Sequence, residues 1–132
     1  MSIQLSVAVR NARLDSIETT ISTSPKLQIR TGTPPADCAT ADSGSLLCEI
    51  ALPSDYLANA ASGAKAKSGT WSGTASGTGT AGHFRIKDNA GTTTHVQGTC
   101  GLGSGDMSLD NTSIASGQTV TVSSFSLTDA NA

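Results

Sequence analysis

The chain has few aromatic and few charged residues, and each shortage argues against a class of protein. Only Tyr56, Trp71, Phe84 and Phe125 are aromatic among 132 residues. Charged residues make up 14% of the chain, the formal net charge is −2, and the lysines and arginines are scattered. Because proteins bind phosphate backbones through clustered cations, this pattern argues against a nucleic-acid partner.

Long apolar runs and patterned cysteines are also missing. No stretch approaches the roughly 20 apolar residues of a membrane-spanning helix, and the first ten residues lack the basic start of a secretory signal. The three cysteines, Cys38, Cys48 and Cys100, have no CxxC spacing, so we expect no zinc site. A Cys38–Cys48 bridge is conceivable, but folding in a cytosol favours reduced, buried or half-buried thiols.

Clusters of titratable or nucleophilic residues, by which many enzymes are recognised, are not apparent. No GxSxG elbow surrounds a serine, and no glycine run carries the lysine of a phosphate-binding loop. The carboxylates are dispersed, and we expect Asp106 and Asp110 to cap turns rather than act as paired glycosidase acids. The sequence predicts a protein that is not an enzyme and has no cofactor or metal.

Serine, threonine and glycine, by contrast, are abundant. Serine and threonine number 37 and glycine 14, together more than a third of the chain. Sparse charge and periodic apolar runs argue against disorder. Apolar segments recur every 8–12 residues between turn residues, which predicts a mainly β fold: a single antiparallel, sandwich or jelly-roll-like domain with Thr-rich strand faces.

One helix is predicted, over residues 4–22, within an N-terminal segment 1–24 that precedes a β-domain spanning 25–132. Its apolar residues fall on one stripe, with Ala8 and Ala12 beside it: Val7, Leu14, Ile17 and Ile21. Pro25 prevents the helix from continuing. The helix could cover an open face of the sheet, which we favour, or dock on a partner.

Strands are predicted at residues 26–32, 46–52, 70–76, 81–88, 92–99, 107–110 and 118–128. Residues 54–61 start with a plausible helix cap, Ser54, and would form one or two helical turns, and 62–69 would be a connector. In the last strand, Phe125 and Leu127 are out of phase with Val120 and Val122, so we expect a bulge near residues 123–124.

The most specific local prediction is a hairpin between residues 81–88 and 92–99, with Gly91 left-handed in a three-residue loop. Pairing Asp88 with Thr92 places Phe84 opposite Val96 and puts an apolar row on the inner face. The same register places a polar row outward, toward solvent or a partner: His83, Arg85, Lys87, His95 and Gln97. The two histidines would be diagonal neighbours there, and without a third ligand we expect no metal site.

Phrases spread over nearly the whole chain resemble short virion structural proteins of tailed bacteriophages and prophages. They are the helix ending near Ile21, LQIRTGTPPA (27–36), GSLLCEIAL (44–52), TGTAGHFRIKD (78–88) and TSIASGQTVTVSSF (112–125). The resemblance implies a capsid decoration or cement protein that binds across capsomers and stabilises the head shell. It also implies major capsid protein or other virion proteins as partners, a homo-oligomer, and a place in the virion after synthesis in the host bacterial cytoplasm.

Partner contacts are expected in the N-terminal segment, in loop 32–45 and on the outer hairpin face. The residues are Leu5, Arg10, Arg13, Pro34, Pro35, His83, Arg85, Lys87, His95 and Gln97. Two alternatives stay open: a tail or head–tail junction component, and a carbohydrate- or receptor-binding β-module. A sugar would need an aromatic platform, for which Trp71 and Tyr56 are the candidates, although we expect Trp71 in the core.

Overall fold

A computed structural model describes residues 3–129 as one helix and nine strands. The helix is α1 (Val7–Ile21). The strands are β1 (Lys26–Thr31), β2 (Leu46–Ala51), β3 (Ala64–Ala66), β4 (Ser72–Thr74), β5 (Gly79–Lys87), β6 (Thr94–Gly101), β7 (Met107–Leu109), β8 (Ser113–Ile114) and β9 (Thr119–Thr128). The predicted mainly β fold with one N-terminal helix is therefore confirmed.

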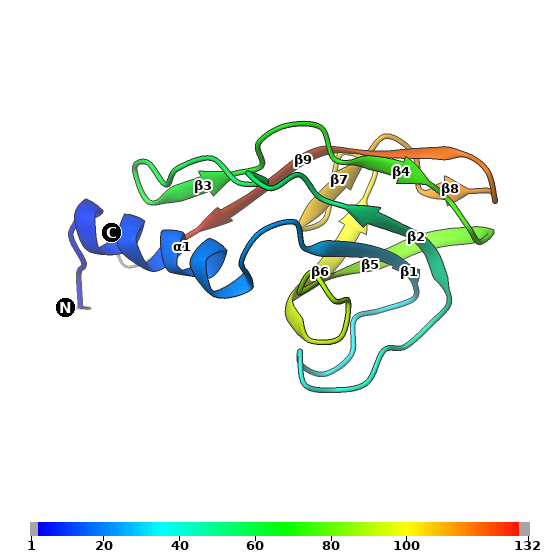
Figure 1. Ribbon diagram of the computed structural model, residues 1–132, viewed down its shortest axis with the longest axis horizontal. Helices are drawn as coiled ribbons and strands as arrows, with labels where there is room; N and C mark the ends of the chain where they lie inside the picture. The colour runs from blue at the N-terminus through cyan, green and yellow to red at the C-terminus, as the bar shows by residue number, and fades with distance from the viewer. Residues whose placement is uncertain (1–2, 130–132) are drawn as a thin grey trace.

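The strands form one curled sheet in the order β2-β1-β5-β6-β7-β9-β3, with β4 also paired to β9 and β8 to β5 (Figure 1). The main-chain amides of Ser76 and Gly77, just after β4, donate to the carbonyl of Leu47 in β2 at 2.9 and 3.1 Å. These two bonds bring the region beside β9 against the opposite edge strand, so the sheet curls around its own core.

The sheet is mixed, so the prediction of a purely antiparallel sheet is wrong. Strands β6 and β7 run parallel, with Cys100 opposite Met107. Only the loop 102–106 separates them, and Gly103 and Gly105 take positive φ values of 69° and 79° in it. Glycine adopts this conformation without steric cost, so the loop can turn tightly within a few residues. The chain then enters β7 running in the same direction as β6.

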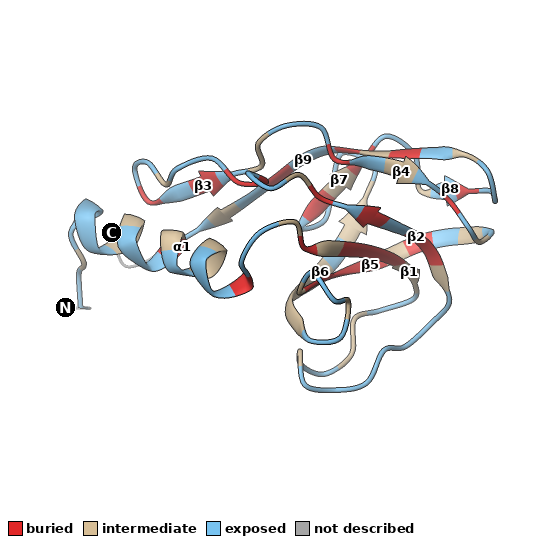
Figure 2. Ribbon diagram, in the orientation of Figure 1, coloured by how far each residue is buried: buried red, intermediate tan, exposed pale blue. Residues whose placement is uncertain are grey.

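One apolar core lies inside the curl, and residues of β1, β2, β5, β7 and β9 contribute to it (Figure 2). The rings of Trp71 and Phe84 each lie 5.5 Å from the ring of Phe125, measured between centroids. Trp71 is fully buried, which confirms its predicted place in the core. The predicted bulge in the last strand is also confirmed, because Leu109 faces Val122 whereas Ser108 faces Ser124.

The hairpin β5–β6 forms as predicted, but its register is shifted by two residues. Ile86 faces Val96 and Arg85 faces Gln97. The loop is longer than predicted because the Asp88 carboxylate accepts the amides of Thr92 and Thr93 at 2.8 and 3.3 Å. These bonds hold additional residues in the turn before the ladder begins. Gly91 has a φ of 75°, which confirms its left-handed conformation.

Residues 54–61 contain no helical turn, and strand β3 replaces part of the predicted connector. The main chain of this segment finds partners outside itself. The amides of Leu57, Ala60 and Gly63 donate to side chains of α1, and the amide of Ala58 donates to the carbonyl of Ala66 at 2.8 Å. A local helix would compete with all of these bonds, which is why the cap-like sequence does not start one.

Helix α1 lies beside β3 at one end of the molecule rather than over a sheet face (Figure 1). It begins at Val7 because the Ser6 hydroxyl accepts the amide of Val9 at 3.2 Å. Leu14 and Ile21 are buried and Ile17 packs against the core, as the stripe predicted. Val7 belongs to the same predicted stripe but is 48% exposed, because the first turn of α1 extends past the sheet.

Candidate functional site

The outer face of β5 is buried, so its predicted exposure is wrong. His83 is fully buried, Arg85 is 1% exposed and Lys87 is 6% exposed. The segment 32–45, which joins β1 to β2, crosses over these side chains and supplies polar partners to them. We call this segment the strap.

Arg85 fastens the strap through two of its three guanidinium nitrogens, and the third bonds to β6. Its Nη2 donates to the carbonyls of Asp37, Cys38 and Thr40 at 3.1, 3.2 and 2.9 Å. Its Nη1 donates to Asp42 Oδ1 at 2.6 Å, and its Nε to Gln97 Oε1 at 3.2 Å. A planar fork of this kind fixes the direction of several acceptors at once, so Arg85 determines the path of the strap.

Asp42 lies among three cations. Besides Arg85, Lys87 Nζ approaches its Oδ2 at 2.6 Å and Arg30 Nη2 approaches the same oxygen at 3.2 Å. Burial of the Asp42 carboxyl raises its pKa, but the hydrogen bonds from Lys87 and Arg85 and the charge of Arg30 outweigh burial and lower that pKa to about 2. One ionised carboxylate thus faces three cations, an excess of two positive charges.

Other predicted contact residues also belong to this internal structure. Gln97 Nε2 donates to the carbonyl of Pro35 at 2.8 Å, and Pro34 and Pro35 are both half-buried. The Nδ1 atom of His83 lies 3.0 Å from the carbonyl of Gly32, so Nδ1 carries the proton in this contact, and the buried Nε2 has no partner among residues 3–129. The predicted face is therefore a set of strap contacts.

His95 is separated from this cluster, contrary to the predicted histidine pair. His83 faces Thr99. The register shifts between Ile86, which faces Val96, and Lys87, which faces Thr94, so His95 has no residue opposite it in β5. His95 lies beside the last turns of α1, in a hollow of about 190 Å³. Among residues 3–129 no group of three or more histidine, cysteine, aspartate or glutamate side chains is placed to hold a metal ion.

A second set of polar contacts holds α1 in place. Asn11, Asp15 and Glu18 share one helical face and accept the amides of Gly63, Ala60 and Leu57 at 3.0, 3.0 and 3.3 Å. Lys65, which is 1% exposed, donates to Asp15 at 2.7 Å and to the Ala58 carbonyl at 2.8 Å, and lies 3.4 Å from Glu18. Sequence reasoning missed this arrangement, although the spacing of the three acceptors is a usable signal.

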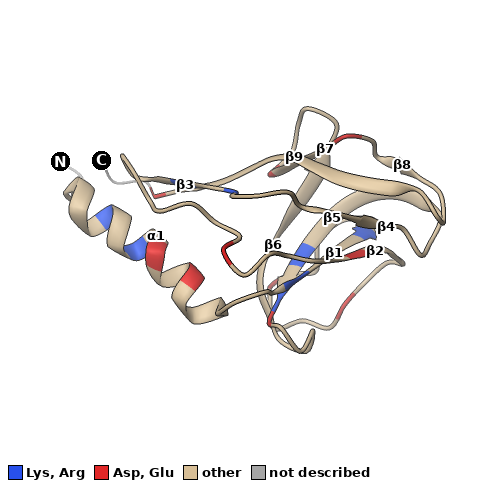
Figure 3. Cartoon of the chain, turned by 45° about the horizontal axis from the view of Figure 1, so that its top comes forward, with Lys and Arg blue, Asp and Glu red and all other residues tan. Residues whose placement is uncertain are grey.

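Two of the three predicted contact residues of the N-terminal segment, Leu5 and Arg10, are half-buried. Arg13 is exposed, and its Nε pairs with Asp129 at 3.1 Å. Three large apolar side chains in this region are exposed as well: Ile3 at 80%, Val7 at 48% and Val9 at 46%. Figure 3 shows cations followed by carboxylates along α1, after this apolar start.

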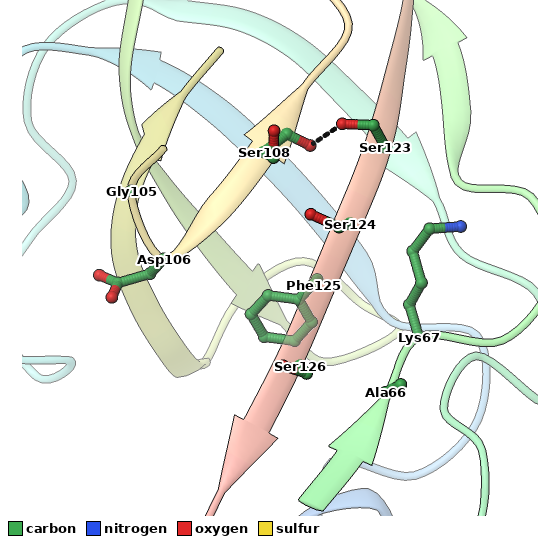
Figure 4. A pocket seen from close by; sticks show the side chains of 9 residues that line it. All are labelled: Ala66, Lys67, Gly105, Asp106, Ser108, Ser123, Ser124, Phe125 and Ser126. Atoms are coloured by element: carbon green, nitrogen blue, oxygen red, sulfur yellow. Dashed lines mark hydrogen bonds between the residues drawn. The ribbon is translucent and has the colours of Figure 1, made fainter. Parts of the chain in front are cut away.

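A hollow of about 530 Å³ lies over β7 and β9 (Figure 4). Four serines line it, and the Ser123 hydroxyl donates to the Ser108 carbonyl at 3.0 Å. Lys67 and Asp106 stand on opposite sides of the group in Figure 4. No histidine is among the residues that line this hollow, and its charged side chains are Lys67 and Asp106.

The three thiols are free. Burial, aided by the charge of Asp106, raises the pKa of Cys100 to about 12, and burial, aided by Glu49, raises the pKa of Cys48. Because the thiolate is the reactive form, these raised pKa values favour the less reactive thiol form of both groups. Cys38 lies half-buried in the strap, apart from Cys48, as the preferred reduced state predicts.

Comparison with known proteins places this chain in no family. No protein-family model matches the chain, and neither a curated protein nor a solved structure matches it. Within the described residues, no helix is long and apolar enough to cross a membrane.

Proposed function

We propose that this protein is a non-enzymatic structural component of a bacteriophage virion, namely a decoration or cement protein that binds across capsomers and stabilises the head shell. Three features support the proposal: the phage-like phrases of the sequence, a small domain held together by polar contacts at two places, and a hydroxyl-rich surface. Its partners would be the major capsid protein or other virion proteins, with many copies acting together.

The observation that carries the proposal is the exposed apolar start of α1. Val7 and Val9, in the first turn of α1, and Ile3, just before the helix, are exposed. The start of α1 lies at the end of the molecule away from β1, β2 and β5 (Figure 1). The polar contacts of α1 to residues 57–63 hold this apolar start outside the core. Exposed apolar side chains at the free end of an anchored helix suit an apolar groove of a neighbouring virion protein.

We further propose that the curled sheet is a variant of the sandwich or jelly roll expected from the sequence. Strands β1, β2 and β5 contribute to one side of the core and β7 and β9 to the other, as the two layers of a sandwich do.

A tail or head–tail junction component would present the same surfaces, and its copy number would differ. A carbohydrate-binding module has less support, because sugars stack on exposed aromatic rings. Trp71 and Tyr56, the two candidates, are 0% and 1% exposed. We therefore place the virion role first.

Composition of purified virions tests the proposal directly. Electrophoresis of particles should show this 13.2 kDa chain. Hundreds of copies per particle would support a decoration role, and a handful would indicate a connector. Absence of the chain from particles that are made in cells expressing it would overturn the virion role.

Substitutions of the exposed valines test the docking surface. Val7→Asp with Val9→Asp should abolish binding to undecorated capsids in a sedimentation assay, because a charge cannot enter an apolar groove. Aspartate is favourable in the first turn of a helix, so the variant should keep its fold. The matched control is Leu102→Asp, which alters an exposed leucine (65%) in the loop 102–106 and should bind normally.

A further inference from the structure

We propose that the hollow between the strap and the loop after β5 is an oxyanion-binding site, which takes a phosphate or carboxylate group. The hollow measures about 400 Å³, and Arg85, Lys87 and three successive threonines line it, together with strap residues 38–42. This inference does not rest on the virion role and can be tested on the free protein.

Charge is the first reason. Three cations converge on Asp42, and among the described residues no other carboxylate forms an ion pair with them. The two carboxylates of the flanking loops form no ion pair with these cations: Asp37 accepts the amide and hydroxyl of Thr40 and acts on Arg85 only at longer range, and Asp88 accepts the amide and hydroxyl of Thr92. Cations that are only partly compensated under a strap are costly, and a bound anion would offset that cost.

Hydrogen-bonding capacity is the second reason. Each of the three Arg85 nitrogens already donates a hydrogen bond, so Arg85 contributes mainly charge to the site. Lys87 Nζ uses one of its three N–H groups, toward Asp42, and its side chain is only 7% exposed. Its other two N–H groups have no protein partner in the described part of the chain. They are donors inside a lined hollow, where a charge-assisted bond is strong.

The threonines supply the neutral part of the site. Residues 92–94 line the hollow, and the hydroxyls of Thr93 and Thr94 make no hydrogen bond within the described residues. Hydroxyl groups next to an ammonium group are suitable donors to an oxyanion. The hollow is larger than an inorganic phosphate ion, so it also admits a phosphate or carboxylate attached to a larger molecule.

Titration of inorganic phosphate into the purified protein tests the site. Amide signals of residues 38–42 and 92–94 in two-dimensional NMR spectra should shift and saturate. The unfolding midpoint should rise by about 5 °C at a phosphate concentration ten times Kd, compared with chloride at equal ionic strength. Acetate is the second probe: a response at the same amides identifies the site as general for oxyanions, and phosphate alone restricts it to phosphate groups.

Matched lysine variants separate binding from the general stabilising effect of such salts. Lys87→Met should lose both the saturable shifts and the phosphate-specific rise in the unfolding midpoint. Lys67→Met should keep both, because Lys67 lines the other hollow, over β7 and β9 (Figure 4). Shifts that do not saturate, or that spread evenly over the surface, would overturn the proposal. So would an undiminished response of Lys87→Met, and the wild-type NMR result decides the question even if a variant folds poorly.

Discussion

The two faces of the β5–β6 hairpin are both covered, but by different kinds of contact. On the inner face, Phe84 and Ile86 pack in the apolar core. On the outer face, Arg85 and Lys87 are almost equally buried, yet the strap over them makes directed polar bonds. A strand with alternating side chains can thus be buried on both sides, provided that a loop supplies acceptors to the polar side.

The difference lies in what each face tolerates. Apolar packing depends on volume and is insensitive to pH, so its variants should lose stability uniformly. The strap depends on charge and on the direction of carbonyl groups, so its variants should release one segment and should respond to pH. Each of the following substitutions tests this contrast, beginning with the largest expected effect.

Truncation on the apolar face should have the largest effect. Phe84→Ala removes a ring that contacts Phe125 edge to face, and it leaves a cavity that the closed sheet cannot fill. We expect a loss of about 4 kcal/mol in the free energy of unfolding, measured by chemical denaturation. Phe84→Leu is the control, with a smaller loss. A loss below that of the strap variants would contradict the ranking.

Removal of the Arg85 fork should cost less and act locally. Arg85→Met leaves Asp42 with two partners and strips the strap carbonyls of Asp37, Cys38 and Thr40 of their donor. We expect a loss of about 3 kcal/mol and faster hydrogen exchange confined to residues 37–42. Arg85→Lys keeps the positive charge but lacks the planar guanidinium group, so it should recover only part of the lost free energy of unfolding. Unchanged exchange in the strap would show that Arg85 does not fasten it.

Acid should weaken the polar face and spare the apolar one. The pKa of Asp42 is about 2 in the folded chain, below its ordinary 3.8, so the unfolded chain takes up the proton first. The contribution of Asp42 is therefore complete above about pH 4 and disappears as the pH falls toward 2. We expect about 1 to 2 kcal/mol, reduced by solvent screening of this partly exposed carboxylate. Asp42→Asn should abolish this part of the pH dependence, and Phe84→Leu should retain it.

Lys87→Met should have the smallest effect. Asp42 keeps Arg30 and Arg85, and the methionine fills most of the space of the lysine stem. We expect a change below about 1 kcal/mol in the free energy of unfolding. A loss as large as that of Arg85→Met would show that both cations hold the strap. The distinction between Arg85, which fastens the strap, and Lys87, which is free to bind an anion, would then be wrong.

Local patterns in the sequence predicted much of the fold. The apolar stripe of α1, the bulge in β9, the left-handed Gly91 and the buried Trp71 all follow from periodicity or turn chemistry over a few residues. The hairpin register did not follow, because the Asp88 side chain takes two amides and enlarges the loop. The helical turns predicted for residues 54–61 did not form for a similar reason, since main-chain amides of this segment donate to side chains of α1.

The candidate sites depended on contacts that no short pattern contains. The alternating sequence pattern correctly predicted that His83, Arg85 and Lys87 share one side of β5. It also predicted that this side faces solvent or a partner, whereas the strap covers it. Arg85 meets Thr40 and Asp42 across more than 40 residues of chain, and Lys65 meets Asp15 across 50. These encounters turned a supposed partner surface into an internal clamp and revealed the hollow beside Lys87.

The sequence by itself determined the class of the fold, because strand and helix periodicity, turn residues and a lean set of apolar side chains act over a few residues. It also determined which side chains share a face. Only the tertiary structure decided which faces meet solvent, since the burial of a polar face requires acceptors from a distant loop. The strap supplies them through main-chain carbonyls, which every residue possesses and which leave no mark in the sequence.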